Sequence, residues 1–178
     1  MAGCVRDSKP GSIGRGRVVV WLLGAAWTLP NTLLGLLAGG VGLLGGARIR
    51  LSRRDGALLF VHYPWGPGGA MTLGNVILAT GSDLDGPCAS YAHRAGWCQL
   101  PLMRLGDHER AHVLQYMVLG PLFLPLYLAC GGVSVRNRFE QAADRYAHTG
   151  AGWWPWPRPA APYGTGSQRH SQDPDTKI

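Results

Sequence analysis

The sequence predicts an α+β fold with a membrane-associated N-terminal segment, and three patterns support this class. Residues 18–47 form an apolar run without a charged side chain. Residues 48–80 carry short alternating segments bounded by glycine and proline, which is typical of strands. Helical spacing returns in 101–119 and again around 138–148. We therefore expect an N-terminal apolar helical hairpin or span, a small antiparallel sheet and two further helices.

The apolar run 18–47 is long enough to cross a bilayer, which takes about 20 residues. Pro30 divides it, so it predicts either one kinked span or the two halves of a re-entrant hairpin. Arginines flank the run on both sides, which favours the hairpin because both ends then meet the positive-inside tendency. A cleaved signal peptide fits less well, since its apolar region is only about 7 to 15 residues long.

The composition supports a lipid bilayer as a partner and disfavours a nucleic acid. Of the 178 residues, 46% are hydrophobic and 15% are charged, and the formal net charge is +7. Soluble domains usually carry about 25% charged residues. The positive charges bracket the apolar run, which fits anionic lipid headgroups better than a nucleic-acid groove. The expected regions are a basic segment (1–17), a membrane segment (18–47), a folded domain (48–150) and a tail rich in tryptophan and proline (151–178).

Three segments between positions 48 and 80 are expected to form the sheet. They are 48–51, 57–63 and 71–78. A turn around Gly56 separates the first two, and a glycine-proline loop, 64–69, separates the last two. The sequence therefore predicts three strands in a small antiparallel sheet.

A His-Glu-x-x-His pattern occupies residues 108–112, inside the first of the two later helices. Residues four apart share one face of a helix, so His108 and His112 can direct two imidazoles at one point. Glu109 then projects about 100° round the helix, beside that point. The pattern supplies two candidate zinc ligands and a candidate general base, Glu109.

Glu140 is the candidate for a third zinc ligand. Catalytic zinc sites usually have three protein ligands and a fourth position open to water. The chain between His112 and Glu140 is long enough for one helix to end and a second to return alongside it. Asp144 lies one helical turn beyond Glu140, where its carboxylate can accept the outer N–H of a ligating histidine. The sequence thus predicts Zn²⁺ held by His108, His112 and Glu140, with Asp144 behind one histidine.

The pattern at 108–112, followed by Glu140-x-x-Ala143-Asp144, resembles the gluzincin metallopeptidases. The Glu-x-x-Ala-Asp form is especially similar to their integral-membrane branch. Residues 108–116 and 120–128 also resemble small uncharacterised bacterial membrane proteins that carry one such motif. The resemblance implies a minimal zincin fold, a membrane-associated zinc metallopeptidase, a peptide or protein substrate, and a location in the bacterial inner membrane.

In zinc peptidases of this kind, an edge strand beside the active-site helix holds extended substrate by backbone pairing. The resemblance implies this role for 71–78, and the alternative is a sheet that only covers the helices. Tyr146 and His148 are candidates for polarising the substrate oxygen. A bound zinc ion would lower the pKa of its water toward about 7, and Glu109 would carry that proton to the leaving amine.

Two other classes of function stay open. One is a non-catalytic metal-binding membrane protein, such as a regulator or an assembly factor. The other is a small membrane scaffold in which the histidine pattern is accidental. Zinc content separates the last class from the others, and a hydrolytic activity separates the first two. The oligomeric state and the substrate are not readable from the sequence.

The helix that carries the histidines is expected to begin near Pro101 or at Asp107, and to end at Gly120. The apolar stretch 113–135 fits either burial within the domain or half-entry into the membrane. The Glu140 helix should present a compact face that includes Phe139.

The C-terminal segment and the cysteines give weaker signals. Trp153 to Pro157 fits an anchor at a membrane interface, and 160–178 has the composition of a disordered tail. Cys88 and Cys98 are either free thiols or a bridged pair, and the sequence does not decide between these states.

Overall fold

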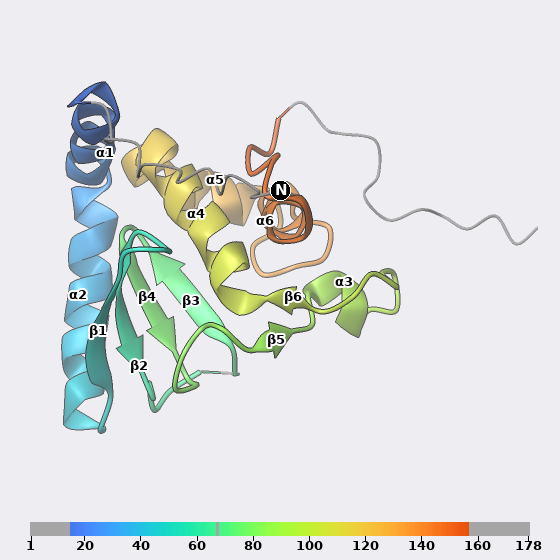
Figure 1. Ribbon diagram of the computed structural model, residues 1–178, viewed down its shortest axis with the longest axis horizontal. Coiled ribbons are helices and arrows are strands. Elements are labelled where there is room, and N and C mark those ends of the chain that lie inside the picture. The colour runs from blue at the N-terminus through green and yellow to red at the C-terminus, as the bar shows by residue number, and fades with distance from the viewer. Residues whose placement is uncertain (1–14, 67, 157–178) are drawn as a thin grey trace, which may run out of the picture.

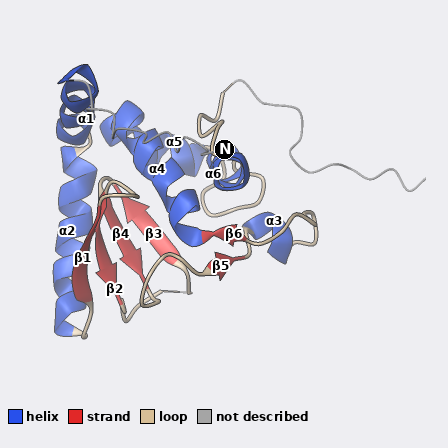
Figure 2. Ribbon diagram, in the orientation of Figure 1, coloured by secondary structure: helices blue, strands red, loops and turns tan. Residues whose placement is uncertain are grey.

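The computed structural model describes residues 15–66 and 68–156 (Figure 1). These residues form a mixed α+β fold in which a small sheet lies between helices (Figure 2). Most of the basic segment, residue 67 and the tail from 157 onward lie outside the described residues, together with the expectations made for them.

The apolar run forms two helices, α1 (Arg15–Trp27) and α2 (Leu29–Leu44), which are bent by 70° from one another. Pro30 stands in the first turn of α2, where its missing N–H costs no helical hydrogen bond, so the break falls just before it. α2 covers one face of the sheet, where Ala38 packs on a cluster built around Phe60. The bend fits both predicted alternatives, a kinked span and a re-entrant loop.

The main sheet has four strands, β1 (Arg48–Ser52), β2 (Ala57–Val61), β3 (Ala70–Leu73) and β4 (Val76–Ala79), in the order β1-β2-β4-β3. As predicted, most of its pairing is antiparallel, but β2 and β4 pair in parallel. The cause is that segment 71–78 is not one strand. Gly74, at φ +63°, turns the chain, so the segment folds into a hairpin and its second half takes the central place beside β2.

The two faces of the sheet pack against different helices. On one face, Leu59, Val61 and Ile77 join Val113 of the histidine helix α4 (Leu105–Leu119) in a buried cluster. On the other face, the cluster around Phe60 packs against α2. β4 is buried along its whole length because both of its faces are covered. In Figure 1, α2 and α4 accordingly lie on opposite sides of the strands.

The helix with the histidines, α4 (Leu105–Leu119), begins between the two predicted starts and ends where predicted, at Gly120, which adopts φ +54°. The apolar stretch after it bends away through a short 3-10 helix, η1 (Gly120–Leu122), into α5 (Phe123–Ala129). The Glu140 helix is α6 (Arg138–Thr149), which packs along α4. The other short elements are β5 (Pro87–Cys88), α3 (Tyr91–Arg94) and β6 (Met103–Arg104).

After α6 the chain returns to the domain at residues 153–156. Pro155 is fully buried, and the Trp156 ring lies edge-on to Phe139 at 5.3 Å between centroids. The tryptophans expected at a membrane interface therefore pack against the domain up to Trp156. Cys88 and Cys98 are free thiols.

Within the described residues, one helical segment is long and apolar enough to cross a membrane, and a second is so only if a bent pair of helices is counted as one span. One is the helical segment Leu105–Ala129, and the other is the bent pair Val18–Trp27 and Leu29–Leu44 taken together. The buried core helix of a soluble protein meets the same criterion, so length and hydropathy alone do not establish a span. What each segment contacts is more informative.

Candidate metal centre

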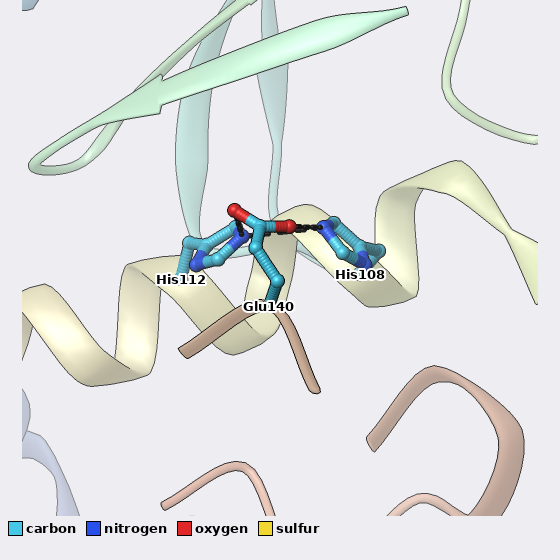
Figure 3. Close-up of side chains that lie close together, drawn as sticks. All are labelled: His108, His112 and Glu140. Carbon is cyan, nitrogen blue, oxygen red and sulfur yellow. Dashed lines mark hydrogen bonds and ion pairs between the residues drawn. The ribbon is translucent and has the colours of Figure 1, made fainter. Parts of the chain in front are cut away.

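Three buried side chains converge between α4 and α6, and they are the three predicted metal ligands (Figure 3). His108 and His112 point to the same side of α4, with their Nε2 atoms 3.2 Å apart. The carboxylate of Glu140 closes the group from α6, with Oε2 at 3.2 Å from His108 Nε2 and Oε1 at 3.5 Å from His112 Nε2. One donor atom from each residue lies within 4.8 Å of the others.

The position of Glu140 depends on how α6 begins. Asn137 caps the helix, because its side-chain oxygen accepts the N–H of Phe139. The Asn137 amide is fully buried and donates to the carbonyls of Tyr127 and Gly132, which ties the start of α6 to the end of α5. Glu140 follows in the first turn, facing α4.

Each histidine has a different partner behind it. His108 Nδ1 lies 3.0 Å from Asp144 Oδ1, which is the contact predicted for Asp144. His112 Nδ1 lies 2.9 Å from Gln115 Oε1. A carboxylate accepts only, and the Gln115 amide nitrogen already donates to the Trp153 carbonyl, so both Nδ1 atoms must be the donors. Each Nε2 then faces the centre of the group, where it can hold a proton or bind a metal ion.

The charges in this group reinforce one another. Burial alone would lower the pKa of His108, but hydrogen bonds to Asp144 and Glu140 outweigh it and hold this pKa well above its ordinary value. The pKa of His112 is raised in the same way, against burial, by the charge of Glu140. Burial would raise the pKa of Glu140, but the two imidazoles lower it below its usual range. The site therefore favours a carboxylate facing cationic partners.

Glu109, the predicted base, is buried on the side of α4 that faces the sheet. Its Oε2 accepts a hydrogen bond of 2.6 Å from the hydroxyl of Thr72. Thr72 belongs to β3, one of the two edge strands of the sheet. The predicted edge strand therefore does lie beside the histidine helix, although only its first half, β3, is at the edge.

A cavity of about 240 Å³ adjoins the three ligands and the edge strand. Tyr127 reaches into it from α5 and donates a hydrogen bond to Glu140 Oε1. Burial and the charge of Glu140 raise the pKa of Tyr127, which keeps the phenol protonated as a donor. Tyr146 and His148, the predicted candidates for polarising substrate, do not line the cavity, whereas Tyr91 and Tyr127 do. Most of the lining is apolar, including Trp65, Met71, Phe123, Leu124, Leu128 and Val133.

Sequence reasoning missed three residues of this site: Thr72, Gln115 and Tyr127. Gln115 carries a usable signal, because it stands three residues after His112 and so lies next to it on the helix. Thr72 and Tyr127 reach the site only through the packing of β3 and α5 on α4. No spacing rule identifies them.

The donor atoms fit a bound cation. Two imidazole nitrogens that face one another at 3.2 Å, with a carboxylate beside them, need a shared proton or a cation between them. Two nitrogens and one carboxylate oxygen, each braced from behind, form a donor set used by divalent transition metals. The buried group of His108, His112 and Glu140 could therefore hold a metal ion.

The chain matches no family model, no curated protein and no solved structure. The resemblance to the gluzincins consequently rests on the two motifs and on the residues that the fold brings together.

Proposed function

We propose that this protein is a membrane-associated zinc metallopeptidase of the gluzincin type. The observation that carries the proposal is the convergence of the predicted ligands His108, His112 and Glu140 in one buried group, with Glu109 next to it. Separate helices supply these residues, and an accidental motif gives no reason for them to meet.

Zinc is the proposed metal because two neutral imidazoles and one carboxylate suit its tetrahedral coordination and leave one position open. When bound, it would supply an acidified water and a positive charge for the developing oxyanion. Protons compete for the same histidine nitrogens, so metal affinity should fall as the pH is lowered. This direction follows from the raised pKa values of His108 and His112 in the metal-free group.

The residues of the chain then have distinct roles. Glu109 takes a proton from the attacking water and returns it to the leaving amine. The Thr72 hydroxyl holds the Glu109 carboxylate in place from the edge strand. The open edge of β3 can pair with an extended peptide backbone, and the apolar cavity beside it can accept a large apolar side chain.

The exposed apolar surface supports the membrane part of the proposal. Large hydrophobic side chains are exposed along α1 and α2, where a soluble domain would carry charges. No ionisable side chain interrupts residues 18–47. We propose a membrane location, consistent with an inner membrane of bacteria.

The test compares wild type with Glu109→Gln, using purified full-length protein in detergent. Bound zinc is measured by elemental analysis, and hydrolysis is measured on fluorogenic peptides with aromatic or aliphatic residues. We expect equal zinc in both proteins and hydrolysis only in wild type, because an amide cannot accept the proton. Equal hydrolysis by both proteins would remove Glu109 from the mechanism. Zinc without hydrolysis in wild type would favour a metal-binding regulator, and wild type without zinc would refute the metal site.

A further inference from the structure

α2 has two faces of opposite character. Gly35, Gly39 and Gly42 lie on one of them and are buried. The other carries large apolar side chains that are more than half exposed, among them Leu34, Leu37, Val41 and Leu44. At 100° per residue, the glycines and the large side chains stand on roughly opposite sides of the helix. One face of α2 therefore consists of small residues and the opposite face of large apolar ones, and neither face is polar.

The glycine face attaches α2 directly to the sheet along its length. A methyl group built on Gly35 would come within 2.7 Å of Val76, and one on Gly42 within 2.5 Å of the Tyr63 ring. The same addition at Gly39 would overlap the Phe60 ring. At its N-terminal end, α2 is fixed by the Asn31 amide, which donates to the Gly120 carbonyl at 2.8 Å. Because α2 is in direct contact with the strands, the strands must lie at the same depth in a membrane as α2.

The strands cannot be placed in the hydrocarbon layer. β1 is an open edge of the sheet, and open edges exposed to lipid leave backbone groups without partners. β1 also carries two exposed arginines, Arg48 and Arg50. If α2 crossed the bilayer, this strand would lie within it. The attachment of α2 to the sheet therefore argues against a span.

The exposed face of α2 continues onto the sheet. Ile49 and Leu51 pair with residues of β2 whose side chains lie on the α2 side, and both are more than half exposed. At the border of this surface, Trp21 and Arg53 line a shared hollow. Tryptophan and arginine side by side suit the boundary between acyl chains and anionic headgroups. We name the docking face as Leu34, Leu37, Val41, Leu44, Ile49 and Leu51.

We propose that the docking face lies on an anionic lipid bilayer, with α2 in the plane of the interface and not across the membrane. The large side chains enter the acyl layer, the glycine face stays toward the sheet, and Arg53 reaches the headgroups. α2 also contacts β3 and η1, so the lipid surface lies beside the elements that frame the metal centre. This inference rests on the proposed membrane association and not on the zinc chemistry.

The test measures how deeply α2 sits. Full-length protein is prepared with its native cysteines replaced, spin-labelled singly at Leu34→Cys, Leu37→Cys, Val41→Cys or Leu44→Cys, and placed in vesicles of phosphatidylcholine and phosphatidylglycerol. Depth is read from the ratio of accessibility to oxygen and to a water-soluble nickel chelate. For a helix in the plane, we expect all four labels at similar shallow depth. A spanning helix would instead separate Leu34 and Leu44 by about 15 Å along the membrane normal.

A steep depth gradient along α2 would overturn the in-plane arrangement while leaving membrane association intact. Labels with no exposure to oxygen-rich lipid would show that another protein surface, such as a second copy of the chain, covers the face.

A second measurement uses unlabelled protein with native cysteines, so it does not depend on the labelled background. Arg53→Glu should weaken binding to phosphatidylglycerol vesicles and leave the weaker binding to pure phosphatidylcholine unchanged. Equal loss on both vesicles, or none, would contradict the headgroup contact.

Discussion

α2 and α4 lie on opposite faces of one sheet, and both are part of segments apolar enough to be taken for membrane spans. They differ in what they bury. α2 buries glycines against the strands and exposes its large side chains. α4 buries His108, Glu109 and His112, whose side chains contact the sheet on one side and α6 on the other. Hydropathy averaged along a helix does not distinguish these cases.

The difference assigns a role to each helix. A buried ionisable group is costly unless it is paired, so the polar cluster of α4 requires the surrounding partners that α6 and β3 supply. The glycines of α2 need only close contact with the sheet. Because they occupy the buried face, the large apolar side chains of α2 are left exposed on the other face, which is unfavourable in water. α4 is therefore a helix of the domain interior, whereas the exposed side of α2 still lacks a covering surface within the described residues.

The largest expected effect is at α4. His112→Ala removes one of three proposed ligands, and zinc affinity should fall by more than the roughly 100-fold that loss of an outer partner can cost. We expect α2 and the sheet to keep their packing, since the described partners of the His112 ring lie on α4, α5 and α6. Zinc affinity by chelator competition and thermal unfolding of the metal-free protein measure the two effects. Zinc affinity equal to that of wild type would contradict the contrast drawn between α2 and α4, because α4 would then be a packed helix without a metal-binding role.

The parts of this site that follow from the sequence are those set by residue spacing along a helix. His108, Glu109 and His112 were predicted together because their geometry is fixed by helical spacing alone. The contact between Asp144 and His108 was also predicted, from its place one turn after Glu140. Gln115 could have been predicted by the same rule.

The remainder depends on contacts between distant segments. The hydroxyl of Thr72 meets Glu109 only because Gly74 breaks segment 71–78 into a hairpin and leaves β3 at the sheet edge. Leu73-Gly74-Asn75-Val76 is a recognisable hairpin signal, and taking 71–78 as one strand was wrong for this reason. Tyr127 reaches Glu140 through the bend after Gly120, whose angle no local pattern specifies.

The next effect tests the glycine face of α2. Gly39→Ala should destabilise the domain by about 1–3 kcal/mol, because the new methyl group overlaps the Phe60 ring. Gly40→Ala is the matched control, since a methyl group there has no neighbour within 4 Å and gains the same helix propensity. Both free energies of unfolding are measured by denaturant titration in the same detergent. Equal stability of the two variants would mean that α2 is not held against the sheet, which would also remove the basis for its in-plane position.

The smallest expected effect concerns the two histidines of α4, which have different partners behind them. Asp144→Asn replaces a charged acceptor behind His108 by a neutral one, and Gln115→Met removes a neutral acceptor behind His112. Hydrogen bonds to a charged acceptor are roughly twice as strong as neutral ones. We therefore expect zinc affinity to fall toward about 100-fold for Asp144→Asn and nearer about 10-fold for Gln115→Met.

Gln115 also holds the Trp153 and Phe139 carbonyls, so its loss affects packing as well as the metal. The two contributions separate because stability is measured without metal and affinity with it. A Gln115→Met protein that is less stable but binds zinc as wild type does would make Gln115 a packing residue only. An Asp144→Asn protein with unchanged affinity would leave His108 oriented by Glu140 alone. We thus predict a larger loss of zinc affinity for Asp144→Asn than for Gln115→Met. This order holds only if the Nδ1 atoms of both histidines donate, because that tautomer directs both Nε2 atoms at one ion.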